Sequence, residues 1–138
     1  MADTVRRVDY FYTTAPHKPG AGARLLGLLR DRGVNLLAFS GFPAGRRAQL
    51  DFVPADSAGF VAVAKAAKVK LSPPKAVFLI DGDDRAGAIA EITGKLGAAK
   101  INITAIDAVR AGAGRFGALV WVKPKDVQKA AAVLGAMG

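Results

Sequence analysis

The stretch Lys18-Pro-Gly-Ala-Gly-Ala-Arg-Leu-Leu-Gly-Leu-Leu-Arg-Asp-Arg-Gly-Val-Asn-Leu36 returns 67 residues later as Arg85-Ala-Gly-Ala-Ile-Ala-Glu-Ile-Thr-Gly-Lys-Leu-Gly-Ala-Ala-Lys-Ile-Asn-Ile103. At this one offset Gly20 aligns with Gly87 and Asn35 with Asn102, and several apolar positions between them coincide, among them Leu29 with Leu96. Repetition at a fixed offset is typical of a fold built from repeated units. We therefore interpret the chain as two copies of one unit, residues 1–72 and residues 73–138.

Each copy has the pattern of a strand, a helix, two strands and a second helix. Leucines three and four residues apart predict the first helix, with Pro19 suited to its first position and Gly33 to a left-handed cap at its end. Asp56 and Asp126 are expected where the second helices begin, because a carboxylate suits that end of the helix dipole. The expected strands are Val5–Thr14, Leu36–Phe42 and Ala48–Val53 in the first copy, and Ala76–Ile80, Ile101–Val109 and Phe116–Val122 in the second.

A further strand at Val69–Leu71 would complete a β-α-β-β-α-β unit in the first copy, and the chain ends before its counterpart. We therefore predict an α/β chain of the α+β sandwich type, with antiparallel sheets, helices on one face and a second unit that lacks its last strand. That leaves an open edge beside Ala76–Ile80. Because an open apolar edge invites aggregation, we expect a strand from the first copy or from a second subunit to cover it.

The composition excludes several classes of protein. The 138 residues include no Cys and one His, which rules out a disulfide framework, a thiolate zinc site and a multi-histidine metal cluster. The acidic run Asp81-Gly-Asp83-Asp84 lacks the further ligands of a calcium loop, and the chain shows no catalytic dyad or triad. We expect no enzyme activity, metal or cofactor. Apolar runs of strand length only, and a start without a signal-peptide pattern, predict a cytoplasmic protein without a membrane segment.

The net charge of +9 favours an acidic partner, and nucleic acid is one alternative. The run Gly114-Arg115-Phe116-Gly117 is similar to the third strand of RNA-binding ferredoxin-like domains, which stack bases on exposed aromatic side chains. No second aromatic residue follows at the required spacing, and Lys and Arg are spread along the chain. The sequence therefore does not favour a nucleic-acid partner.

The repeated unit resembles the ACT domain, a ferredoxin-like regulatory module that binds amino acids. The resemblance rests on Pro19-Gly20 at the start of a helix, on Gly33-Val34-Asn35-Leu36 before a strand, and on Gly87 and Ile101-Asn102-Ile103 in the second copy. It covers residues 5–138, and the chain is similar to stand-alone tandem ACT proteins.

The resemblance implies a ligand site between two ACT units, made by the loop before the first helix of one unit and the start of the second strand of the other. A helix N-terminus offers free N–H groups to a carboxylate, and an Asn amide can contact both a carboxylate and an ammonium group. Asp84 could pair with the ammonium group; alternatively it is an ordinary acid at the helix start, the asparagines shape turns, and His17 faces solvent. The implied site residues are His17, Lys18, Pro19, Gly20, Asn35, Leu36, Asp84, Arg85, Ala86, Gly87, Asn102 and Ile103.

The resemblance further implies a non-catalytic regulatory or allosteric protein, a homodimer that binds a small amino acid and acts on an enzyme or regulator of amino-acid metabolism. Two alternatives stay open from the residues. One is a nucleic-acid-binding ferredoxin-like protein, and the other is a protein–protein interaction module without a small ligand.

Overall fold

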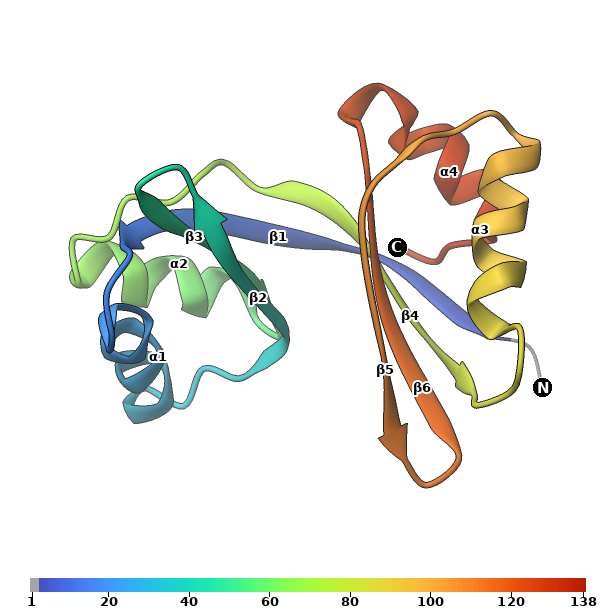
Figure 1. The fold of residues 1–138 in the computed structure, drawn as a ribbon. Coiled ribbons are helices and arrows are strands. Elements are labelled where there is room, and N and C mark those ends of the chain that lie inside the picture. The colour runs from blue at the N-terminus through green and yellow to red at the C-terminus, as the bar shows by residue number, and fades with distance from the viewer. Residues whose placement is uncertain (1–2) are drawn as a thin grey trace. The chain divides into compact units, whose positions relative to one another are not determined.

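A computed structural model describes residues 3–138, which form two compact units. One unit is Asp9–Lys75, here called the unit 9–75. The other combines residues 3–8 with Ala76–Gly138 and is here called the unit 76–138 (Figure 1). The boundaries 1–72 and 73–138 therefore stay a prediction about family domains, while the compact units divide the chain differently.

The order of elements follows the predicted repeat and confirms an α+β fold of antiparallel strands and four helices. The elements are β1 (Thr4–Pro16), α1 (Ala21–Asp31), β2 (Leu36–Ala44), β3 (Arg47–Pro54), α2 (Ser57–Ala66), β4 (Lys75–Asp83), α3 (Ala88–Ala98), β5 (Ile103–Gly112), β6 (Arg115–Val122), a 3-10 turn (Pro124–Asp126) and α4 (Val127–Leu134).

In the unit 9–75 the strands lie in the order β2-β3-β1, and both neighbouring pairs are antiparallel. Phe52 of β3 lies opposite Phe11 of β1 and opposite Phe39 of β2. Its ring centroid is 5.1 Å from that of Phe60 on α2, and Leu29 of α1 joins the same buried cluster. The two helices therefore cover the sheet face that carries Phe52.

In the other unit the strands lie in the order β1-β4-β6-β5. Ile80 of β4 lies opposite Ala118 of β6, and both belong to a core with Ile92 and Leu96 of α3 and Ala130 of α4. Figure 1 shows α3 and α4 side by side against this sheet. Among the described residues, no helix of either unit is long and apolar enough to cross a membrane.

The first residues of β1 lie beside β4 and cover the edge that the sequence leaves open. Val5 is 7% exposed and belongs to the core of the unit 76–138. On the outer side of this segment, the Arg7 N–H donates to Met137 O at 2.8 Å and the Met137 N–H donates to Val5 O at 2.9 Å. A single strand of the first copy therefore contributes to both units.

The predicted strand at Val69–Leu71 is wrong, because this segment contacts β1 but has no regular secondary structure. The Thr13 hydroxyl donates to Lys70 O at 2.7 Å, and the Tyr12 N–H donates to the Ser72 hydroxyl at 2.9 Å. Side-chain hydroxyls therefore make bonds that backbone groups make in a strand, and Pro73 has no N–H to continue the pairing.

Two predicted element boundaries also need correction. Pro19 is not the first helical residue: α1 starts at Ala21, and its N-cap Gly20 has φ +81°, which is incompatible with a helix. In the second copy β5 starts at Ile103 rather than Ile101, because the Ile101 N–H closes the end of α3 by donating to Leu96 O at 3.0 Å.

The left-handed cap predicted at Gly33 is confirmed, with φ +70° and a bond from the Val34 N–H to Leu29 O at 2.9 Å. The other helices close in the same way, at Lys68 (φ +59°), Lys100 (φ +60°) and Gly135 (φ +67°). Two of these four positions thus hold a lysine in a conformation that favours glycine.

Candidate functional site

The loop between β4 and α3 borders a hollow of about 380 Å³ in the unit 76–138. The start of α3 and the end of β5 form its other walls. Its lining residues are Asp84, Arg85, Gly87, Ala88, Ile89, Ala90, Ala108, Val109, Arg110 and Phe116. Three of the predicted site residues, Asp84, Arg85 and Gly87, therefore meet around one hollow.

Asp84 is held in place through both its backbone and its side chain. Its N–H donates to Gly114 O at 2.8 Å, and its Oδ2 lies 3.1 Å from Arg110 Nε. The N-cap of α3 is Gly87 and the helix starts at Ala88, so the alternative interpretation of Asp84 as an ordinary acid at the helix start, an N-cap or a first-turn residue, is wrong. The ion pair is exposed, with 35% of the Asp84 side chain and 75% of the Arg110 side chain accessible. Exposed pairs add little to stability, so a ligand can replace this one at low cost.

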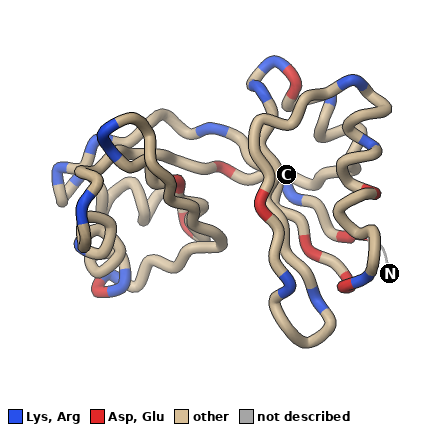
Figure 2. Tube along the Cα trace, in the orientation of Figure 1, with Lys and Arg blue, Asp and Glu red and all other residues tan. Residues whose placement is uncertain are grey.

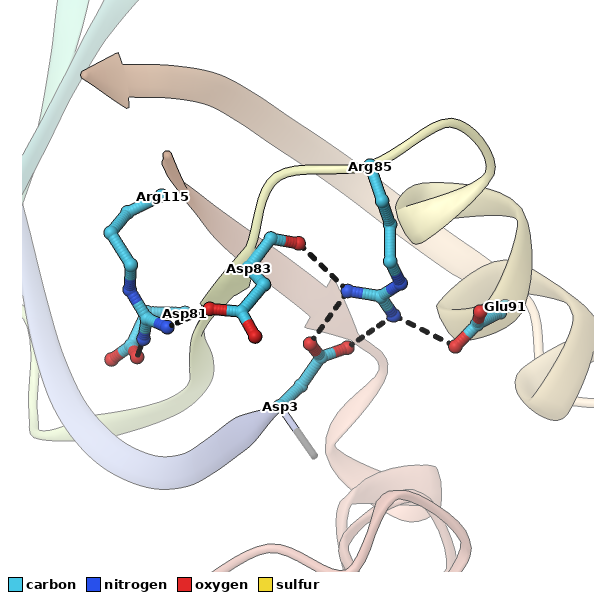
Figure 3. A network of polar contacts seen from close by, with 6 residues as sticks. All are labelled: Asp3, Asp81, Asp83, Arg85, Glu91 and Arg115. Carbon is cyan, nitrogen blue, oxygen red and sulfur yellow. Dashed lines mark hydrogen bonds and ion pairs between the residues drawn. The ribbon is translucent and has the colours of Figure 1, made fainter. Parts of the chain in front are cut away.

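Arg85 is committed to contacts within its own unit, as Figure 3 shows. Its guanidinium donates to both carboxylate oxygens of Asp3, at 3.0 and 3.2 Å, to Glu91 Oε2 at 2.8 Å and to Asp83 O at 2.9 Å. The hydrogen bonds to Asp3 and then those to Glu91 raise the pKa of Arg85 above its ordinary value. Arg85 therefore fastens the start of β1 to α3, which the sequence did not reveal because the partners are 82 residues apart.

The acidic residues at the end of β4 and directly after it are paired with arginines. Arg115 donates to Asp81 Oδ1 at 2.5 Å and to Asp83 Oδ1 at 2.9 Å (Figure 3), and Asp84 pairs with Arg110. In the part of the chain that the structure describes, no group of three metal-ligating side chains comes together. These carboxylates therefore have their counter-charges within the protein.

Gly20 and Gly87 owe their identity to backbone conformation. Their φ values are +81° and +85°, and a Cβ built on either would meet no atom within 4 Å. A side chain is thus disfavoured by the dihedral angle and not by crowding. Both glycines are exposed N-caps in the left-handed conformation, so α1 and α3 start with the same backbone geometry.

The predicted residues of the first copy are placed in two groups. His17, Lys18, Pro19 and Gly20 are all exposed in the turn after β1. Asn35 and Leu36 line a separate hollow of about 380 Å³ at the C-terminal end of α1.

Each loop lies at the opposite end of its sheet from the asparagine of the same unit. In the unit 9–75, Pro16 pairs with Arg47, at the far end of β3 from the pair Leu36 and Pro54. In the other unit, Asp83 pairs with Arg115, whereas Ile103, which follows the exposed Asn102, pairs with Val122. Within a unit the two halves of the predicted site therefore do not meet. Ala86 is exposed and does not line the hollow beside α3.

Val109, Arg110 and Phe116 line the hollow but were not predicted as site residues. The repeat gave no signal for Arg110, because its counterpart at the same offset is Pro43. Phe116 is 5% exposed and packed in the core, so it offers no stacking surface to a base. Figure 2 shows Lys and Arg distributed over both units rather than on one element.

Comparisons with known proteins agree on the fold. The family model described as the ACT domain matches residues 76–137. The structure of protein BT0572 from Bacteroides thetaiotaomicron matches with a TM-score of 0.81 and 18% identity, over 95% of this chain and 88% of that one. The regulatory subunits of aspartate kinase from Thermus thermophilus and Thermus flavus match with TM-scores of 0.65 and 0.60 and identities of 17% and 18%. They cover 98% and 97% of this chain and 95% and 94% of theirs.

A comparison with curated protein sequences found no match. The structural likenesses, all below 20% identity, show a shared fold, and the family match identifies the region 76–137. The predicted resemblance to the ACT domain is therefore confirmed for residues 76–137, the region that matches the family model.

Proposed function

We propose that the protein is a non-catalytic regulator that senses a small amino acid through its ACT domain. The observation that carries this proposal is the exposed pair of Asp84 and Arg110 on the rim of the hollow beside α3. An amino acid has an ammonium and a carboxylate group on one carbon atom, and this pair offers the opposite charge to each. The regulatory subunits of aspartate kinase, which share the fold, support the regulatory role.

In this proposal the ligand separates the pair and takes its place. Asp84 accepts from the ammonium group, while Arg110 and the first-turn N–H groups of α3 donate to the carboxylate, as helix N-termini do for anions. Ala108 and Val109 line the same hollow and contact the side chain of the ligand. Gly87 holds the loop in the conformation that opens this helix end.

The remaining predicted residues enter through a second unit. Asn35 with Leu36 and Asn102 with Ile103 lie at the sheet ends away from the loops, so they can contact a ligand only across an interface. We propose a homodimer, and β2, an edge strand with the exposed side chains Leu37, Phe39 and Phe42, offers an apolar surface for it. The regulated partner is an enzyme or regulator of amino-acid metabolism. The cytoplasmic location stays a prediction.

The test is a thermal-melting screen of the full chain against the twenty amino acids. A ligand at a hundred times its Kd stabilises the folded state by about 2.7 kcal/mol, a shift of several degrees. The Asp84→Asn variant is expected to lose the shift, and Asp107→Asn, an exposed acid elsewhere on β5, is the matched control that keeps it. No shift with any amino acid, or an equal shift in Asp84→Asn, would contradict the proposal.

The exposed apolar side chains of β2 also favour a second candidate function, a protein–protein interaction module without a small ligand. Sedimentation measurements on the wild type and on Phe42→Ser separate the two. A dimer that Phe42→Ser disrupts, together with a flat amino-acid screen, would favour the interaction module.

A further inference from the structure

A second hollow, of about 170 Å³, lies between the end of β1 and α1 within the unit 9–75. Leu25, Leu50 and Val69 give it apolar walls, and Thr14 and Arg24 bring polar groups to it. It is separate from the hollow beside α3, with which it shares no residue. An apolar hollow with one charged group suits a small amphipathic ligand.

The repeat shows what the equivalent place holds in the other unit. At the offset of 67 residues, Ala15 corresponds to Gly82, Lys18 to Arg85 and Arg24 to Glu91. A Cβ built on Gly82 would collide with Oδ1 of Asp3, so the Asp3 carboxylate fills the space over this glycine. Figure 3 shows that carboxylate on Arg85, with Glu91 on the other side of the guanidinium. One unit therefore carries its own carboxylate at this place.

The unit 9–75 has no such carboxylate. Val69 lines the hollow there, and none of the lining residues is acidic. Within residues 3–138, neither Lys18 nor Arg24 forms an ion pair. The unit holds ten Lys and Arg against four Asp, whereas the other unit holds ten against seven Asp and Glu. The hollow is therefore lined by the Arg24 guanidinium and by no carboxylate that could pair with it.

We propose that this hollow binds a small aliphatic carboxylate, with its charged group on Arg24 and its alkyl chain against Leu25, Leu50 and Val69. The guanidinium fork matches a carboxylate and forms the strong class of hydrogen bonds. The ligand carries no amino group, because an ammonium placed among these residues would lack a counter-charge. This site differs from the amino-acid site at Asp84 in both place and ligand.

The test titrates the full chain with 4-methylpentanoate, followed by calorimetry and by amide NMR shifts. Leucine and 4-methylpentanamide are the matched probes, since one adds an ammonium group and the other removes the negative charge. We expect one bound 4-methylpentanoate per chain, shifts around Leu25 and Val69, and much weaker binding of the amide. Arg24→Gln should weaken binding about tenfold or more, as the loss of a charge-assisted hydrogen bond does.

Arg32→Gln, which changes an exposed arginine just beyond the same helix, is the control and should bind like the wild type. No saturable binding, equal binding of the amide, or equal affinity in Arg24→Gln would overturn the proposal. Leucine shifts around Leu25 equal to those of 4-methylpentanoate would overturn the exclusion of the amino group. The Asp84→Asn variant should leave 4-methylpentanoate binding unchanged, so this site and the amino-acid site can fail separately.

Discussion

Shortening Val5 to alanine should destabilise the unit 76–138, although Val5 stands at the other end of the chain. Val5 is 7% exposed and packs in the core that contains Phe78 and Leu134. Val5→Ala removes two buried methyl groups, at about 0.8 kcal/mol each, and leaves a cavity. We therefore expect the free energy of unfolding to fall by about 2 kcal/mol, which moves a urea midpoint by roughly 1 M.

Trp121 provides the assay, because it is the single tryptophan and lies buried in β6 of that unit. Its fluorescence during urea unfolding reports the unit that Val5 is expected to stabilise. Val109→Ala is the matched control, since Val109 is 66% exposed and its loss should change the free energy by less than about 0.5 kcal/mol. Equal midpoints for Val5→Ala and Val109→Ala would refute the role of β1 in this core.

Four further substitutions probe the backbone and the buried carboxyl group of Asp51. Lys100→Gly should raise the free energy of unfolding by about 0.5–1 kcal/mol, since φ +60° suits glycine; an unchanged urea midpoint would contradict this. Gly82→Ala should lower it by about 1–3 kcal/mol because the methyl group collides with Asp3, whereas Gly94→Ala, in open space on α3, should raise it by about 1 kcal/mol. Burial raises the pKa of Asp51. The contribution of its carboxyl group to the free energy of unfolding is therefore fully present below the ordinary pKa and is lost as the pH rises through the raised pKa. The stability advantage of Asp51→Asn should therefore grow from about pH 4 upward, and urea titrations that show a constant difference would exclude this.

The sequence was sufficient for the parts of the fold that depend on local patterns. The repeat placed both turns before the helices, and Gly20 and Gly87 have nearly the same φ. Gly33 ended its helix as predicted because a left-handed cap has a local signature. Val69–Leu71 failed for a reason that local patterns do not contain: the hydroxyl of Thr13, 57 residues from Lys70, takes the bond that a ladder would need.

The site was harder to predict, because charge pairing is a property of the folded chain. Asp84, Arg85 and Gly87 line one hollow, and their role in binding a ligand stays a prediction. Arg85 nevertheless has its carboxylate partner in Asp3, and only the register of β1 beside β4 brings these two together. Arg110, which pairs with Asp84, corresponds to the uncharged Pro43 in the first copy. A sequence repeat predicts the features that the two copies share, and these ion pairs lie in the unit 76–138 alone.

This difference has a consequence for how the two copies work. In the unit 76–138, the start of β1 supplies a strand and the buried side chain of Val5. The Asp3 carboxylate just before it pairs with Arg85. In the unit 9–75, Arg24 stands where the other unit has Glu91, and it lies at a hollow with no acidic lining residue. In our proposal, a carboxylate from solution takes the place in the unit 9–75 that the Asp3 carboxylate holds in the other unit. Because the same β1 serves both units, a ligand held against its end at Thr14 contacts the strand whose other end Arg85 fastens.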